Sequence, residues 1–84
     1  MRRTPIQVTQ DILRIARHRP IKRTPLQRKS NLSTKRFNQY YEDLYYKGLI
    51  DIDDTAHVYV TDKGCIFLEK SQQLNKFMNE FGFV

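Results

Sequence analysis

A short run of hydroxyl, basic and amide side chains at residues 33–39 is of the kind that binds phosphate and reads the edges of bases. Free backbone N–H groups and the dipole at the start of a helix favour an anion, and the residues expected at such a start are Ser33, Thr34 and Lys35. Arginine can pair with guanine, and asparagine or glutamine with adenine, in the major groove of DNA. The residues on the same turns that could read bases are Arg36, Asn38 and Gln39. The basic residues before the run that could hold flanking phosphates are Lys22, Arg23, Arg28 and Lys29.

The charge of the 84-residue chain is unevenly distributed. The net charge is +6, from 15 Lys and Arg against 9 Asp and Glu. Residues 1–50 hold 12 basic residues and 3 acids, a net charge of +9, whereas residues 51–84 hold 3 basic residues and 6 acids, a net charge of −3. A basic half joined to a mildly acidic half predicts one surface that binds a polyanion.

Two helices are predicted before the polar run. The first spans residues 4–17, with Thr4 as its N-cap and Pro5 at its first helical position. The pair Thr24-Pro25 repeats this start, so a short second helix is predicted at residues 25–30, after an extended link.

A third helix, which would carry the polar run, is predicted at residues 33–47. Asn31-Leu32 forms the turn before it, because Asn tolerates a left-handed backbone. Ser33 is its N-cap, and Gly48 is the glycine that ends it. The residues spaced to form its buried stripe are Phe37, Tyr41 and Leu44.

The acidic half predicts a hairpin and a final helix. Strands at residues 49–52 and 57–60 flank a turn at residues 53–56. Thr61 caps a helix that runs from residue 62 to about residue 81. The complete order of elements predicts a winged helix-turn-helix, an α+β fold that is mainly helical, with three helices, a two-stranded wing and an extended C-terminal helix.

We therefore predict a single winged-helix domain over residues 1–84, because a chain of this length has no room for a second core. Its core would be residues 4–61 and its C-terminal helix residues 62–82. Residues 33–47 would be the recognition helix, lying in the major groove of double-stranded DNA. Gly64 would allow close packing where the last helix begins.

Several segments are similar to those of a known family. They are Asp11-Ile12-Leu13, Tyr40-Tyr41, Leu44, Leu49-Ile50 and Thr61 to Gly64. With them the chain resembles the small archaeal winged-helix DNA-binding proteins that associate with the nucleoid. The resemblance implies a homodimer that binds DNA and is joined through its C-terminal helices in an antiparallel coiled coil. This chain departs from that pattern in its shorter final helix and its acidic wing.

The last helix carries more apolar residues than closing the core requires. We expect Cys65, Ile66 and Leu68 to pack inward and residues 71–81 to project beyond the domain. Phe67, Leu74 and Phe81 recur every seven residues, which suits a seam between two helices. The predicted dimer interface is Phe67, Leu74, Phe77, Met78 and Phe81. Alternatively, this helix folds back over the first helix and buries the stripe within one protomer.

The chain is expected to be a transcription regulator or a chromatin protein. A winged-helix module for protein–protein interaction is the alternative, which the acidic wing favours. RNA binding is a third possibility, weakened by the lack of an RNA-binding signature.

No enzyme, cofactor or metal site is expected. Neither His18 nor His57 has an evident catalytic partner in the sequence, and no glycine-rich phosphate loop is present. The acids at residues 51–54 lack the spacing of a calcium loop, and Cys65 is expected to be a small buried hydrophobe. The longest apolar run, residues 65–68, is too short for a membrane span. With a single cysteine and no signal peptide, the chain is expected in the cytoplasm, at the nucleoid.

Overall fold

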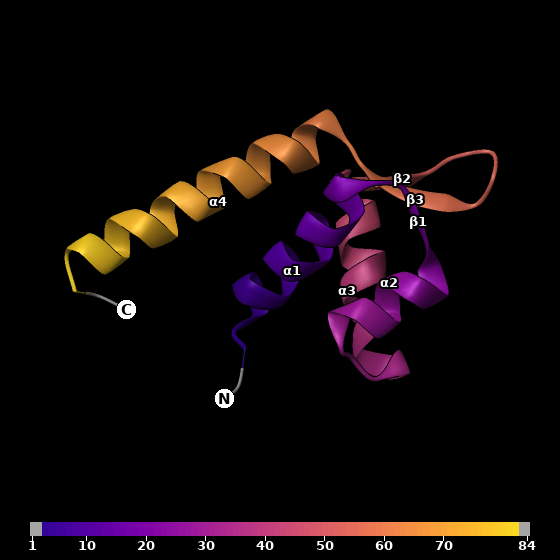
Figure 1. Ribbon diagram of the computed structural model, residues 1–84, viewed down its shortest axis with the longest axis horizontal. Coiled ribbons are helices and arrows are strands. Elements are labelled where there is room, and N and C mark those ends of the chain that lie inside the picture. Colours follow the sequence, from indigo (N-terminus) through magenta and orange to yellow (C-terminus); the bar gives the residue numbers. More distant parts are fainter. Residues whose placement is uncertain (1–2, 83–84) are drawn as a thin grey trace.

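A computed structural model describes residues 3–82 of the chain as four helices and a small antiparallel sheet (Figure 1). Its elements in chain order are α1 (Pro5–His18), β1 (Ile21–Lys22), α2 (Arg23–Ser30), α3 (Thr34–Tyr46), β2 (Ile50–Ile52), β3 (His57–Val60) and α4 (Asp62–Glu80). This order and the sheet confirm the winged helix with a C-terminal helix.

Hydroxyl caps begin three of the four helices, as predicted. Thr4 forms a capping box with Gln7 at the start of α1, and the Ser33 hydroxyl accepts a hydrogen bond from the backbone N–H of Arg36. The Thr61 hydroxyl accepts from the backbone N–H of Gly64. Each cap satisfies a backbone donor that has no partner within the helix.

The start of α2 differs from the prediction at residue 25. The helix begins at Arg23, directly after β1, and its N-cap, Lys22, makes no side-chain cap hydrogen bond. Thr24 therefore lies inside the helix rather than capping it. Pro25 is tolerated there because backbone N–H groups in the first turn need no partner within the helix.

Left-handed residues end α2 and α3. Asn31 has φ 56° and ψ 47°, and its backbone N–H donates to the carbonyl of Arg28. Gly48 has φ +75°, a conformation that costs a glycine little. These two residues turn the chain sharply before and after α3.

The sheet has three strands in the order β1-β3-β2, all antiparallel. Ile50 lies opposite Val60 in the predicted hairpin, and Ile21 lies opposite Val58. The short extended link after α1 thus adds a third strand to the two-stranded wing. Ile21 and Val58 are both buried, so this pairing ties the wing to the core.

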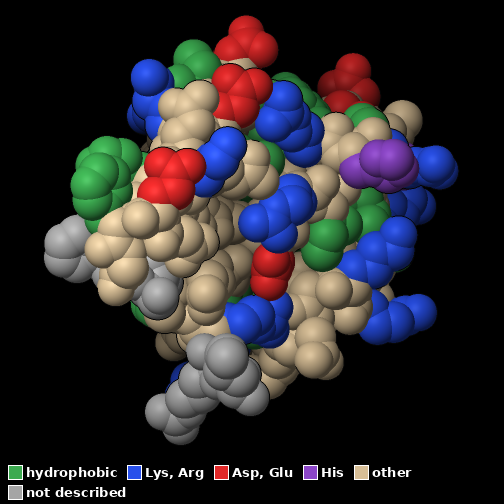
Figure 2. Space-filling view, turned by 60° about the vertical axis from the view of Figure 1, so that its left-hand side comes forward, with side chains coloured by type: hydrophobic (Ala, Val, Ile, Leu, Met, Phe, Trp, Pro, Cys, Tyr) green, Lys and Arg blue, Asp and Glu red, His purple; other side chains and the backbone are tan. Residues whose placement is uncertain are grey.

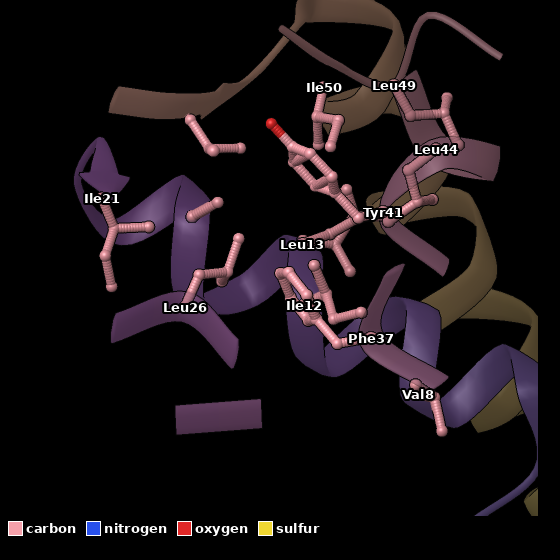
Figure 3. Close-up of a cluster of buried hydrophobic side chains, with 13 residues drawn as sticks. Val8, Ile12, Leu13, Ile21, Leu26, Phe37, Tyr41, Leu44, Leu49 and Ile50 are labelled. Carbon is pink, nitrogen blue, oxygen red and sulfur yellow. The ribbon is translucent and has the colours of Figure 1, made fainter. Parts of the chain in front are cut away.

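The hydrophobic core lies between α1, α2, α3 and the sheet, as Figure 3 shows. The predicted stripe of α3 is buried, and the rings of Phe37 and Tyr41 stack with centroids 5.6 Å apart. Ile12, Leu13 and Leu26 are completely buried against them. This core fixes which face of α3 points outward.

Close contact with the wing sets the orientation of α4. A Cβ atom on Gly64 would lie 2.1 Å from the backbone oxygen of Leu49, so only glycine fits without a shift. Leu68 is buried, as expected, but Cys65 is only half-buried and Ile66 is 54% exposed. The prediction that Ile66 packs inward is wrong, because the Gly64 contact turns this residue to the outside.

The second half of α4 does not simply project from the domain. It continues beside α1: Arg17 pairs at 3.1 Å with Glu69 in the first half of α4, and the amide of Asn75 in the second half donates to Gln10 Oε1 at 3.1 Å. Its C-terminal turns extend past the start of α1 (Figure 1). Within residues 3–82, no helix is long and apolar enough to cross a membrane.

Candidate nucleic-acid interface

The outward face of α3 is polar along most of its length. Lys35, Arg36 and Gln39 are exposed on the side of the helix opposite the buried Phe37 and Leu44. None of these three side chains hydrogen-bonds to another residue in the described part of the chain. They are therefore available to a ligand that lies along α3.

Arg23 and Asn38 are tied to each other, although Arg23 remains exposed. The guanidinium of Arg23 lies over the ring of Tyr41, 4.4 Å from its centroid, and donates a hydrogen bond to Asn38 Oδ1. Asn38 is half-buried on the side of α3 that faces α2. Burial raises the pKa of the Tyr41 phenol, and the nearby Arg23 charge opposes that rise. The structure thus gives this pair a role in joining α2 to α3.

A polar hollow of about 570 Å³ opens at the turn between α2 and α3. Gln27 spans it, donating to Thr34 Oγ1 at 3.0 Å and to the carbonyl of Leu32 at 3.4 Å. Arg28 and Ser33 lie on its wall, beside the start of α3. The hollow places a guanidinium next to the helix N-terminus that the sequence singled out for phosphate.

Ion pairs divide the basic residues into two groups. Acidic partners hold Arg3, Arg14, Arg17 and Lys47. By contrast, six predicted contact residues have no acidic partner within residues 3–82, namely Lys22, Arg23, Arg28, Lys29, Lys35 and Arg36. A surface of uncompensated cations is the usual electrostatic footprint of a nucleic-acid-binding domain.

Among the predicted contact residues on α2, Lys29 differs because it lies on the side of the helix away from α3. Its side chain lines a hollow with residues of α1 and β1, whereas Gln27 and Arg23 contact α3. The sequence grouped Lys29 with Arg28 because they are adjacent, but adjacent residues of a helix point about 100° apart.

Two tyrosines at the end of α3 were not assigned to the interface from the sequence. Tyr46 is 87% exposed, and it contacts Tyr45 edge to face, with ring centroids 6.5 Å apart. Both line a cleft of about 400 Å³ with Tyr41 and Ile52 of β2. The period of α3 signals this exposure, since Tyr46 follows Lys35 and Gln39 on the same outward face.

The tip of the wing is acidic and rigidly built. Asp53 Oδ1 accepts hydrogen bonds from the backbone N–H groups of Thr55 and His57 and from the Thr55 hydroxyl. The Thr55 hydroxyl bond is the main cause that lowers the pKa of Asp53, so this carboxylate stays charged at neutral pH. Asp54 beside it is exposed. Both carboxylates would repel phosphate.

An apolar surface on α4 lies away from the unpaired Lys and Arg side chains of α2 and α3. Leu74, Phe77 and Phe81 are 59%, 54% and 62% exposed, and the rings of Phe77 and Phe81 are 4.7 Å apart. Met78 is half-buried on the same helix, whereas the half-buried Phe67 packs against the core of its own protomer. Figure 2 shows hydrophobic side chains at one edge of the molecule and most Lys and Arg side chains away from that edge. Packing on α1 therefore does not bury the stripe within one protomer.

No cluster of three or more potential metal ligands lies among residues 3–82. His57 instead forms a hydrogen bond with Thr55, its Nδ1 atom 2.8 Å from the hydroxyl oxygen.

Comparison with known families agrees with this geometry. A family model described as winged helix-turn-helix matches residues 2–79, so the chain belongs to the winged helix-turn-helix family. That family is a class of DNA-binding domains, typically without enzymatic activity. A search of curated proteins found no match to the chain.

Proposed function

We propose that the protein binds double-stranded DNA with α3 in the major groove. The observation that carries this proposal is the row of unpaired polar and basic side chains on the outward face of α3, next to the polar hollow at its start. Arg36 and Gln39 face the base edges. Arg28, Ser33 and Lys35 hold phosphates, because they surround free N–H groups at a helix N-terminus.

Two protomers act together through α4. The exposed apolar stripe costs free energy in water, and a second copy of the same stripe removes it from solvent. Phe67 and Phe81 each lie seven residues from Leu74. In an antiparallel pair of helices centred on Leu74, the Phe67 side chain lies opposite the partner's Phe81. Such a dimer presents two α3 helices to one duplex and raises its affinity by avidity.

In this proposal the homodimer works in the cytoplasm, as a nucleoid-associated protein or a transcription regulator. Contacts with phosphates supply most of the affinity and are independent of sequence. Whether bases are also read depends on Arg36 and Gln39, since Asn38 is held by Arg23.

Titration of random duplex DNA at several salt concentrations tests the proposal. If each protomer neutralises about three to five phosphates, log K falls against log salt with a slope of about −3 to −4 per protomer. Single-stranded RNA serves as the comparison ligand. Absence of duplex binding at low salt would reject DNA binding and favour the protein-interaction module, for which the exposed α4 stripe and acidic wing are suited.

A further inference from the structure

A second basic hollow lies between α1, β1 and α2, outside the surface assigned to α3. Its volume is about 550 Å³, and no carboxylate is among the residues that line it. Those residues are Arg14, Ile15, His18, Arg19, Ile21 and Lys29. The arrangement is an apolar floor surrounded by cationic side chains.

Two of these cations have no competing acidic partner in the described chain. Arg19 and Lys29 are exposed and form no ion pair within residues 3–82, whereas Arg14 is held by Asp11 at 2.9 Å. Arg19 is the residue that ends α1, where unpaired carbonyl groups favour positive charge. The hollow therefore holds two uncompensated positive charges at a fixed place in the fold.

The hollow and the α3 surface lie on opposite sides of α2. Gln27 and Arg23 reach from α2 to Thr34 and Asn38 of α3. Lys29, on the other side of α2, faces α1 instead. A duplex that lies along α3 is thus separated from Arg19 and Lys29 by the body of α2.

We propose that this hollow binds the phosphate backbone of a second segment of duplex DNA while α3 binds the first. The inference rests on the proposed DNA binding and adds a second site to each protomer. Phosphate is the matching ligand because the cations are unpaired and are spread over two elements. Base readout is not expected, since the hollow presents no amide side chain.

Charge reversal at the two unpaired cations tests the second site. The variant Arg19→Glu/Lys29→Glu is compared with Lys63→Glu/Lys76→Glu, which makes the same change in net charge at two exposed residues of α4 outside its apolar stripe. One assay measures binding to a single short duplex. The other measures how much of a labelled duplex the protein brings to a duplex fixed on beads.

We expect wild type and the α4 variant to capture the labelled duplex. Arg19→Glu/Lys29→Glu should capture about tenfold less while binding the single short duplex within about threefold of wild type. Circular dichroism verifies that both variants are folded, and neither pair of side chains is part of the core.

Three results would overturn the second site. Capture that persists in Arg19→Glu/Lys29→Glu would mean that two α3 surfaces of a dimer join the duplexes. No capture by wild type would mean that it holds only one segment. Equal loss in both assays would place Arg19 and Lys29 in the same footprint as α3. Failure of wild type to bind even the single duplex would instead reject the proposed function itself.

Discussion

Helices α3 and α4 both present a face that the core does not bury, but the two faces differ in chemistry. The outward face of α3 carries Lys35, Arg36 and Gln39, whereas that of α4 carries Leu74, Phe77 and Phe81. A polar face is stable in water without a partner, but an apolar stripe is not. The proposed function accordingly assigns a charged ligand to α3 and another apolar surface to α4.

The two faces should also respond differently to salt. Attraction between Lys or Arg side chains and phosphates weakens as ionic strength rises. Burial of Leu74 and Phe77 is driven by the hydrophobic effect, which screening of charges by salt does not weaken. DNA binding and self-association can therefore be changed one at a time, which is how the comparison is best tested.

The largest effect is expected from Lys35→Glu/Arg36→Glu. In the proposal Lys35 holds a phosphate and Arg36 a base edge. Each such charge-assisted contact contributes about 1.5–3 kcal/mol, so losing both should weaken duplex binding by about a hundredfold or more. Thermal unfolding should be unchanged, because both side chains are exposed. Gel-shift titration measures the affinity, and Lys63→Glu/Lys76→Glu, at two exposed residues outside the apolar stripe of α4, is the control of equal charge. Equal weakening by the control would mean that total charge, and not α3, determines binding.

The next largest effect is expected from Phe77→Asp. A central apolar anchor of an interface contributes about 2 kcal/mol or more, so the dissociation constant of the dimer should rise about thirtyfold or more. Sedimentation measures the oligomeric state, and Asn79→Asp, an exposed substitution on the same helix outside the apolar stripe, is the control. A monomeric wild type at tens of micromolar, or an unchanged dimer dissociation constant in Phe77→Asp, would show that α4 is not the interface.

A smaller effect distinguishes residues that contact bases from residues that contact phosphates on and beside α3. Gln39→Ala should cost about 1–3 kcal/mol on a preferred sequence and less on random DNA, because a base contact depends on sequence. Arg28→Ala should weaken all duplexes to the same extent, since phosphates carry no base information. Competition titrations with the two kinds of duplex measure both. Uniform losses for both variants would indicate a chromatin protein that reads no base.

Local patterns in the sequence predicted most of the fold. Ser33, Gly48 and the spacing of Phe37, Tyr41 and Leu44 predicted α3 to within one residue at each end. Caps and turn residues are local signals, and the structure confirms them at Thr4, Asn31 and Thr61.

Features that depend on contacts between residues far apart in the sequence could not be predicted. Two-residue strand β1 has no periodicity of its own and exists because Ile21 pairs with Val58. Ile66 faces outward because Gly64 packs against Leu49, a contact between residues far apart in sequence.

The candidate site was likewise predictable where it depends on local residue types and unpredictable where it depends on tertiary packing. Residue types and net charge pointed to the region around α3, and the structure gathers Arg28, Ser33 and Thr34 at one hollow. The sequence could not show that Arg23 stacks on Tyr41, nor that Lys29 faces α1, because both depend on how α2 packs between its neighbours.

The smallest effect concerns the wing, whose charge is opposite to that of α3. Asp54→Asn should tighten nonspecific duplex binding by about twofold or threefold at low salt, because it removes one exposed charge that repels phosphate. Asp53 is unsuitable for this test, since its carboxylate accepts three hydrogen bonds that shape the turn. Asp62→Asn, which removes an acid at the start of α4, is the control of equal charge. Tightening by Asp54→Asn alone would place the wing tip near phosphate. A marked loss of binding would instead give Asp54 a direct contact, and the wing would then join α3 as part of the binding surface.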